Sequence, residues 1–393
     1  VQTPVLAAIS RRYRERENHI SSDSWPIYIS LQKDGILFKM RRTQDLPDKE
    51  SATMFFQDCK LSHQAQITGI SHSVKEILPP DLLDLTQLQK EANIRYGYTA
   101  SEVYDIAQSL YEKKLISYPR TSSRYLTEDV FDSLPPIMAR LLSWELFPAA
   151  KGTGGIDISN LSRHVISAEK ANVHHAIIIT GIRPGNLSEK EMQVYRLVAG
   201  RMLETFMAPC RIETTNVEAV CAAQHFKAEQ TRIIEAGWHD VFMRSDMVPK
   251  SGYSVNELPE VEKGDNLNVC GCNMVHKKEL PVDPFTDAEL VEYMELNGLG
   301  TVSSRTNIIR TLVNRKYIRY SGKYIVPTPK GMFTYETIRG KKIADTSLTA
   351  DWEKQLTGLE SGMITGQDFL NRIRTLAKEM TDDIFNTYST KEE

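Results

Sequence analysis

Two different periods of hydrophobic residues alternate along the chain and divide it into successive helical and strand-like stretches. The first twenty residues have the spacing of an amphipathic helix, and charged residues take over after Ser10. From Trp25 to Met40 the period changes to two around Asp34-Gly35, which predicts a β-hairpin. More strand-like sequence follows from Ala65 to Ile77, and Pro79-Pro80 then interrupts the pattern. The pattern thus predicts a helix followed by a β layer.

Helical spacing returns after the two prolines. Two pairs have the spacing of capping boxes and predict helix starts: Thr86 with Gln89, and Thr99 with Glu102. Further helices are predicted near 128–144 and 189–207. The glycine-rich stretch Lys151–Asp157 between them fits no phosphate-binding spacing, so we interpret it as a plain loop.

The β pattern comes back between Arg211 and Val275, and the rest of the chain is helical apart from one hairpin. A chain that leaves a β layer and later returns to it suggests a helical insertion between two halves of one β domain. The helical ends of the chain would then pack together. The sequence therefore predicts an α+β protein of several domains.

Composition narrows the class of protein. The chain has 393 residues, 41% hydrophobic and 25% charged, which argues against disordered and collagen-like proteins. The longest apolar runs fall short of eighteen residues, so we expect no membrane helix. The five cysteines include no CxxC pair, which argues against a zinc site or a disulfide framework and favours a reducing cytoplasm. Because the chain opens at Val1 without a methionine, we interpret it as a piece of a longer protein.

The net charge of −3 hides a local excess of basic residues. Between Thr301 and Asp345 there are ten lysines and arginines against two acids, a local charge of +8. Phosphate binding needs such positive charge, although a run of charges can also be a solvated face.

The segment Phe285–Lys330 carries the sharper signal for DNA binding. Thr286 with Glu289 predicts one helix start, and SRTNIIRTLVNRKY predicts a second helix whose arginines, among them Arg305 and Arg310, lie off the apolar stripe. A hairpin turning at Ser321-Gly322 follows. This order is typical of a winged helix-turn-helix, although such patterns also occur as packing units.

A candidate nucleophile lies in LISYPRTSSRYL. Tyr118 precedes a proline, which holds it in an extended or turn conformation, and Arg120 and Arg124 follow closely. A guanidinium can stabilise a phenolate and hold a phosphate, so this arrangement suits attack on a phosphodiester with formation of a phosphotyrosyl intermediate. Taken alone, a tyrosine before proline is more often a wedge in a turn.

A second candidate is His174 in VHHAIIITG. A histidine beside this apolar run could hydrogen-bond a phosphate or assist a leaving oxygen. The alternative is a pair of histidines at a strand end, one of them buried.

Together these segments resemble the type IA DNA topoisomerases, particularly the bacterial topoisomerase III branch. VQTPVLA looks like the family's VQTPTL segment, and ISYPRTSSRYL is similar to its YPRTDSRYL stretch. VHHAIIITG resembles HHAIIPTG, and NGLGTVSSRTNIIRTLVNRKYI resembles the family's GIGTPATR segment. The four motifs occur in the family's order over roughly the first 340 residues.

The resemblance implies roles for individual residues. Tyr118 would form a 5′-phosphotyrosyl bond with cleaved single-stranded DNA, Arg120 would position the tyrosine and the scissile phosphate, and His174 would contact the scissile region. The residues expected to bind the DNA strand are Gln2, Arg124, Thr301, Ser304, Arg305 and Arg310. Transesterification conserves the phosphodiester energy, so strand passage in relaxation or decatenation would need no ATP.

Several positions depart from the family's pattern. Ser122 stands where the family has aspartate, and Ile179 and Val302 stand where it has proline. The family also begins with an acidic Toprim domain that binds Mg²⁺, and no D-x-D-x-E cluster occurs in this chain. We therefore expect no metal site within these residues, Mg²⁺ bound by the absent domain, and an isolated chain that binds single-stranded DNA without completing relaxation.

The family's toroid predicts the domain limits. Residues 1–25 and 278–393 would form the helical DNA-groove domain, with the winged-helix-like element at about 285–330. Residues 26–78 and 208–277 would form a β-rich arch that acts as a hinge, and 79–207 a helical gate domain carrying Tyr118. The resemblance also implies a monomer in the bacterial cytoplasm, associated with the nucleoid.

Two other functions remain as alternatives. A non-catalytic scaffold that binds DNA would tolerate the change Tyr118→Phe. A tyrosine recombinase would need its tyrosine near the C-terminus of the chain and would make the opposite, 3′-phosphotyrosyl linkage, whereas Tyr118 lies in the first third.

Overall fold

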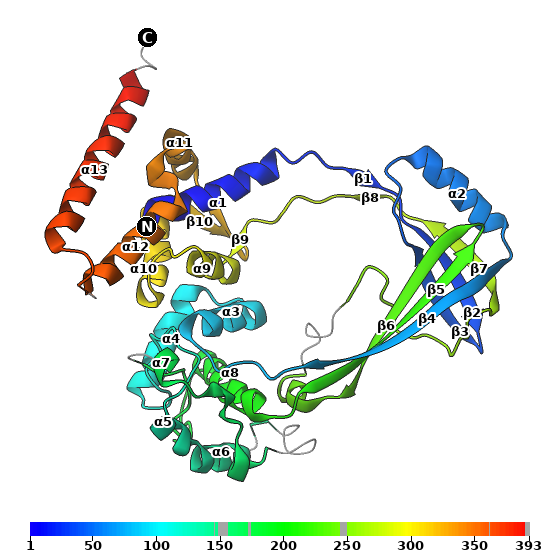
Figure 1. The fold of residues 1–393 in the computed structure, drawn as a ribbon, viewed down its shortest axis with the longest axis horizontal. Coiled ribbons are helices and arrows are strands. Elements are labelled where there is room, and N and C mark those ends of the chain that lie inside the picture. Colours follow the sequence, from blue (N-terminus) through cyan, green and yellow to red (C-terminus); the bar gives the residue numbers. More distant parts are fainter. Residues whose placement is uncertain (145, 148–155, 172–173, 244–249, 361, 390–393) are drawn as a thin grey trace.

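The computed structural model describes residues 1–144, 146–147, 156–171, 174–243, 250–360 and 362–389. Its ribbon forms a ring in which two helical parts lie at one end and a β-barrel at the other (Figure 1). A short antiparallel pair, β1 (Asp23–Ser24) with β8 (Lys277–Lys278), lies between the barrel and the first helical part. The long strands β4 (Gln64–Ile77), β5 (Cys210–Cys221) and β6 (Gln224–Glu235) lead from the barrel toward the second helical part.

The β layer closes into a barrel with strand order β2-β3-β6-β5-β4-β7. Its strands are β2 (Ile27–Lys33), β3 (Ile36–Arg42), β4 (Gln64–Ile77), β5 (Cys210–Cys221), β6 (Gln224–Glu235) and β7 (Asn266–Met274). The predicted hairpin at Asp34-Gly35 is confirmed, because both residues have positive φ values, 51° and 82°, and connect the paired strands β2 and β3. Both halves of the β pattern thus enter a single barrel.

One helix lies between the predicted hairpin and the strand-like stretch Ala65–Ile77, where the sequence pattern predicted none. Helix α2 (Lys49–Leu61) begins where the Asp48 carboxylate accepts a hydrogen bond from the Ser51 amide. Its buried residues are Ala52 and Cys59, seven positions apart, which is a spacing of two helical turns. With only two buried residues, the sequence shows little of the helical periodicity that would have predicted this helix.

The helical insertion lies between β4 and β5. Its helices are α3 (Leu85–Tyr96), α4 (Ala100–Glu112), α5 (Glu128–Asp132), α6 (Leu134–Ser143), α7 (Ala168–Ala171) and α8 (Glu189–Phe206). The capping box of Thr99 with Glu102 is confirmed. The cap predicted at Thr86 was wrong, because Asp84 caps α3 through the Gln87 amide at 2.7 Å. Most of the predicted loop Lys151–Asp157 lies outside the described residues.

The remaining helical part combines the start and the end of the chain. It contains α1 (Gln2–Glu17), α9 (Asp287–Leu296), α10 (Val302–Asn314), α11 (Pro329–Ile338), α12 (Thr346–Glu360) and α13 (Gly366–Ser389). A small sheet of order β10-β11-β9 joins them, formed by Ile318–Ser321, Tyr324–Pro327 and Phe285–Thr286. Val5, Leu6 and Ile9 of α1 pack into one core with α9, α10 and this sheet.

A buried polar seam closes the ring where α3 and α4 pack against α9 and α10. The Gln89 amide donates hydrogen bonds of 2.9 Å to the Thr306 hydroxyl and to the Ala100 carbonyl. The Arg305 guanidinium, 8% exposed, donates to the Thr86 hydroxyl at 3.0 Å and to Glu295 at 3.3 Å. Polar contacts between two separate cores thus hold this side of the ring together.

Asp287, the first residue of α9, is a buried carboxylate of the seam that faces the start of α4. Its Oδ1 accepts hydrogen bonds from the Ala100 amide at 3.0 Å and from the Tyr320 hydroxyl at 3.1 Å. The pKa of Asp287 is raised to about 6, mainly by burial and to a smaller extent by the nearby Glu102, although both hydrogen bonds lower it. A carboxyl that returns to water when the seam parts would regain a value of about 3.9.

We predict that the seam closes more tightly at acid pH and that Asp287 is the cause. Because the closed state has the higher pKa, this contribution is complete below about pH 4 and is lost as the pH rises through about 6. The protection of the Ala100 amide from hydrogen exchange, relative to an unstructured peptide at each pH, should fall about tenfold from pH 5 to pH 7.

Asp287→Asn keeps an acceptor for Ala100 without a titrating proton, so its Ala100 protection should be flat over this range. Asp34→Asn, at an exposed turn of the barrel, is the matched control and should behave like the parent chain. An unchanged fall in protection in Asp287→Asn would contradict the assignment.

Candidate functional site

Tyr118 and His174, predicted from separate motifs, lie side by side. Their ring centroids are 4.5 Å apart, and the Tyr111 ring of α4 meets Tyr118 edge-on at 5.3 Å. Tyr118 is half-buried and His174 is exposed. The phenol is thus oriented by neighbouring rings while the site stays open on the side of His174.

Backbone contacts explain why these two segments meet. Ile116, just before Tyr118, bridges to Ile179, and the Ser117 amide donates to the Ile178 carbonyl at 2.8 Å. The Thr121 hydroxyl donates to the His174 carbonyl at 3.0 Å. The apolar run after the histidines therefore acts as a short strand partner for the YPRT segment. Ile179 fills a buried position in it, which accommodates the loss of the family's proline.

Arg120 is held against α4. Its Nη2 donates to Gln108 Oε1 at 3.3 Å, and its guanidinium lies 5.1 Å from the centroid of the Tyr104 ring. The Arg120 Nε is buried and has no hydrogen-bond partner among the described residues. Tyr104, Gln108 and Tyr111 follow one face of α4, so a single helix orients both Arg120 and Tyr118.

Arg124 forms an ion pair with Asp84. Its Nε lies 2.7 Å from Asp84 Oδ2, and the same carboxylate caps α3. Burial raises the pKa of Asp84, although the Gln87 amide and Arg124 both lower it. The structure thus gives Arg124 a role in fixing the start of α3 beside the YPRT segment, and its predicted contact with DNA stays a prediction.

Ser122, which stands where the resemblance expects aspartate, is exposed on a small pocket of about 360 Å³. Asp81, Asp84 and Glu295 also line this pocket. Carboxylates from other elements are therefore present near the position that lacks one.

Gln2, Thr301 and Ser304 lie around the adjoining starts of α1 and α10. Thr301 and Ser304 form a capping box at the start of α10, with the Thr301 amide donating to Ser304 Oγ at 2.8 Å. A Cβ on Gly300 would meet Val1 at 3.7 Å, which places the start of α1 beside this turn. The Gln2 side chain accepts a hydrogen bond from Arg315 Nη1 at 3.3 Å. Arg315 is one of the arginines off the apolar stripe of its helix, and its distance from Gln2 along the sequence gives no signal for this contact.

Arg305 and Arg310 point into the seam. Arg305 bonds Thr86 and Glu295, while Arg310 bonds Ser101 at 2.8 Å and Asp105 at 2.8 Å, both on α4. Several other basic residues of the +8 block also meet acids from outside it, such as Lys342 with Glu379 at 3.2 Å. Counting charge along the sequence therefore overstated the free positive charge of this segment, because the paired acids come from distant positions.

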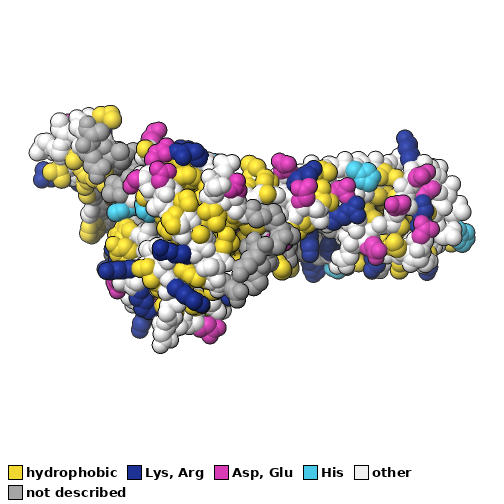
Figure 2. All heavy atoms as spheres, turned by 90° about the horizontal axis from the view of Figure 1, so that it is seen from below, with side chains coloured by type: hydrophobic (Ala, Val, Ile, Leu, Met, Phe, Trp, Pro, Cys, Tyr) yellow, Lys and Arg dark blue, Asp and Glu magenta, His cyan; other side chains and the backbone are white. Residues whose placement is uncertain are grey.

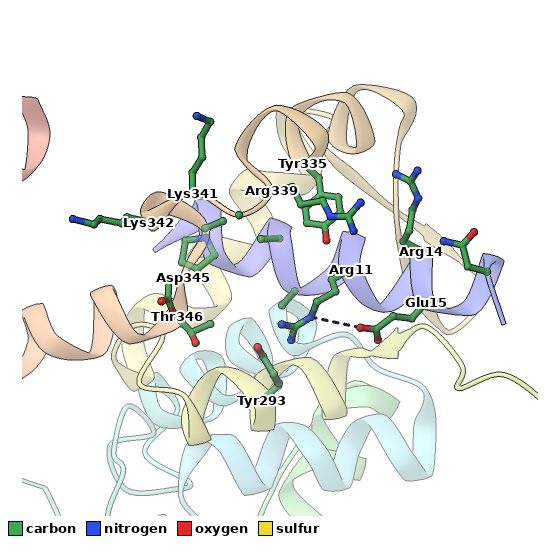
Figure 3. A pocket seen from close by; sticks show the side chains of 16 residues that line it. Arg11, Arg14, Glu15, Tyr293, Tyr335, Arg339, Lys341, Lys342, Asp345 and Thr346 are labelled. Carbon is green, nitrogen blue, oxygen red and sulfur yellow. Dashed lines mark ion pairs between the residues drawn. The ribbon is translucent and has the colours of Figure 1, made fainter. Parts of the chain in front are cut away.

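A larger basic cleft lies on the other side of α1. It has a volume of about 860 Å³, and its lining residues come from α1, α9, α11 and the segment after α11 (Figure 3). In the close-up, Tyr293 points from α9 toward α1, while Arg11 pairs with Glu15. Figure 2 shows Lys, Arg, Asp and Glu mixed with hydrophobic side chains over both the helical end and the barrel end.

The described residues contain neither a cluster of metal ligands nor a helix that could cross a membrane. Within the described ranges, three or more His, Cys, Asp or Glu side chains do not come together in a way that could hold a metal ion. Over the same residues, the helices are all too short or too polar to cross a membrane.

The sequence of this chain is similar to those of known DNA topoisomerases. The family model described as DNA topoisomerase matches residues 1–371. DNA topoisomerase 3 of Bacillus licheniformis is 29% identical over 409 aligned positions, which cover 98% of this chain and 56% of the relative. DNA topoisomerase 1 of Methanocaldococcus jannaschii is 30% identical and is matched over 100% of this chain and 50% of its own length. The chain thus spans about half the length of the curated relatives it matches.

A solved structure confirms the predicted fold class. Full-length topoisomerase I from Thermotoga maritima superposes with a TM-score of 0.74 at 22% identity, over 96% of this chain and 62% of that one. The α+β ring of helical parts and a β arch is therefore the type IA fold. Because the family model covers nearly the whole sequence, this chain belongs to the DNA topoisomerase family, in its type IA, topoisomerase III-like branch.

Proposed function

We propose that this chain is the strand-cleaving core of a type IA DNA topoisomerase III, which cuts single-stranded DNA transiently and reseals it. The observation that carries the proposal is the placement of Tyr118 between Tyr111 and His174, with Arg120 held on the same helix face. A tyrosine that merely wedged a turn would need neither a neighbouring histidine nor a fixed guanidinium.

The reaction is a transesterification at phosphorus. The Tyr118 oxygen attacks the scissile phosphate, a bond from phosphorus to the phenolic oxygen forms, and the bond to the 3′ oxygen of the preceding nucleotide breaks. The phenolic proton is lost and the leaving 3′ oxygen gains one, which leaves a 5′-phosphotyrosyl strand and a free 3′ hydroxyl. The reverse reaction reseals the strand, so no nucleotide triphosphate is consumed.

Arg120 and His174 would stabilise the negative charge that develops on the phosphate and on the leaving oxygen in this step. The half-buried Arg120 guanidinium can donate to a phosphate oxygen while Gln108 and Tyr104 keep it in place. His174 is exposed beside the phenol and can donate to the scissile region or to the leaving oxygen.

The seam lies between the helical insertion, which carries Tyr118, and the helical part formed by the two ends of the chain. Tyr118 belongs to the helical insertion, whereas the turn at Thr301 and Ser304, with Gln2, belongs to the part that would grip the strand. Parting of the seam while the 5′ end is bound to Tyr118 would open the ring for a second strand. The barrel would act as the hinge, because its long strands connect to the insertion.

In the proposed enzyme, Mg²⁺ is bound by residues outside this chain. The described side chains offer no cluster of His, Cys, Asp or Glu that could hold a metal ion. We propose that the family's acidic Toprim domain supplies Mg²⁺ and that this chain alone binds single-stranded DNA as a monomer in the bacterial cytoplasm without relaxing plasmid.

A non-catalytic scaffold that binds single strands is the second candidate. The basic cleft beside α1 and the serine at position 122 favour it, because a strand could bind there without meeting Tyr118.

Covalent capture distinguishes the two candidates. The chain is mixed with the acidic domain of a relative, Mg²⁺ and a single-stranded oligonucleotide labelled at its 3′ end, and is then denatured. We predict that the label travels with the protein, because a 5′-phosphotyrosyl bond keeps the 3′ fragment, and that Tyr118→Phe abolishes the adduct.

Tyr111→Phe is the matched control, since it removes a hydroxyl from the neighbouring ring and should leave the adduct. An adduct that persists in Tyr118→Phe, or labelled strand that binds without any adduct, would overturn the catalytic proposal in favour of another nucleophile or the scaffold.

The role of Gln108 gives a second prediction. Gln108→Ala removes one hydrogen bond to the Arg120 guanidinium and should slow adduct formation about tenfold, since that bond is worth roughly 1.5 kcal/mol. Gln108→Glu keeps an acceptor and should restore a rate within about threefold of the parent.

Gln57→Ala, at an exposed position of α2, is the control for a glutamine lost from a helix surface. Equal rates for Gln108→Ala and Gln57→Ala would show that Gln108 does not position Arg120.

A further inference from the structure

Three of the five cysteines meet in the barrel, although they are far apart in the sequence. Cys59 lies in the last turns of α2, Cys221 ends β5, and Cys272 lies on β7. Cys59 and Cys221 belong to the barrel core and are 0% and 1% exposed, while Cys272 packs against that core and is half-buried. All three thiols are free.

The three thiols lie together in the barrel core, where Cys59 and Cys221 belong to one cluster and Cys272 packs against it. Cys59 is close enough to both of the other thiols for each to influence its pKa. Cys272 Sγ also lies 3.9 Å from the Phe56 carbonyl, which places it directly beneath α2. Helix α2 packs on β7 through this contact.

The surroundings make the three thiols unequal. The hydrogen bond from Cys59 lowers the pKa of Cys272, which favours its thiolate. Cys221 lowers the pKa of Cys59, but the bond with Cys272 and burial outweigh this and raise it to about 12. The bond with Cys59 and burial raise the pKa of Cys221. Cys272 therefore combines access to solvent with the greatest thiolate character of the three.

We propose that Cys272 and Cys59 are a redox-active pair that forms a reversible disulfide between β7 and α2. The oxidant is a low-molecular-weight disulfide such as oxidised glutathione. The site concerns the barrel alone and is independent of the proposed DNA chemistry.

The reaction runs in two balanced exchanges. The Cys272 thiolate attacks one sulfur of oxidised glutathione, whose sulfur–sulfur bond breaks, and one glutathione leaves. The Cys59 sulfur then attacks the Cys272 sulfur of the mixed disulfide, and the second glutathione leaves. The two protons of the protein thiols end on the two glutathione molecules, so two thiols and one disulfide become one protein disulfide and two free thiols.

Proximity favours the second exchange over a lasting mixed disulfide. Cys272 lies beneath α2 at the Phe56 carbonyl, one turn before Cys59, and both cysteines pack in the barrel core, so the two sulfurs can approach to the bonding distance of about 2 Å. Cys221 is fully buried and has a raised pKa, which makes it a poor first target.

The bond would fasten a weakly attached helix. Helix α2 buries only Ala52 and Cys59 fully, and its Met54 and Leu61 are exposed. β7 pairs with both β2 and β4, and β4 leads out toward the helical insertion. Oxidation would therefore stiffen the barrel that joins the two helical parts.

Peptide mapping of the complete, reduced chain tests the proposal. The protein is exposed to oxidised glutathione at mildly alkaline pH, quenched in acid, alkylated, digested without reductant and analysed by mass spectrometry. We expect one cross-linked pair of peptides carrying Cys59 and Cys272, lighter by two hydrogens than the sum of the free peptides and lost on reduction.

Variants identify the partners. Cys59→Ser and Cys272→Ser should abolish the cross-link, whereas Cys221→Ser and the matched buried control Cys210→Ser should keep it. The map of the parent chain decides the question even if a variant fails to fold. Full alkylation of Cys59, a lasting mixed disulfide on Cys272, or a Cys59–Cys221 bond would each overturn the proposal.

Discussion

The polar seam between α3, α4, α9 and α10 is the contact on which the closed ring depends. The two helical parts have separate hydrophobic cores, and what lies between them is largely hydrogen-bonded polar side chains such as Gln89, Asp287 and Arg305. Buried charges add little net stability, because desolvation offsets their attraction, yet they penalise any wrong register. Such a contact can specify one closed geometry and still part without exposing a large apolar surface.

The same seam connects the candidate chemistry to strand binding. Helix α4 orients Tyr118 and Arg120 on one part of its surface and receives Arg310 through Ser101 and Asp105 on another. Helix α10 begins at the turn of Thr301 and Ser304. A shift at the seam would therefore move the nucleophile relative to the proposed strand-gripping turn, and cleavage and opening would be coupled through α4.

Local signals in the sequence predicted local structure well. Asp34-Gly35 specifies its hairpin because both positions need positive φ, and Thr99 with Glu102 specifies a helix start through reciprocal hydrogen bonds. The Tyr118 and His174 motifs predicted residues that the fold brings into contact, although their roles stay predictions. The predictions failed for two different reasons. At the start of α3 the cap is Asp84, a neighbour that the capping-box spacing did not point to. Thr86 and Arg305 instead have partners that are remote in the sequence, because Thr86 donates to Glu295 and the buried Arg305 donates to Thr86.

The most direct test of this account is a crystal structure of the chain with a single-stranded oligonucleotide. If the seam aligns the two halves of the site, the strand will run from the turn of Thr301 and Ser304 across to Tyr118, with a phosphate at the Arg120 guanidinium. A strand found only in the basic cleft between α1 and α11, with Tyr118 untouched, would contradict the account.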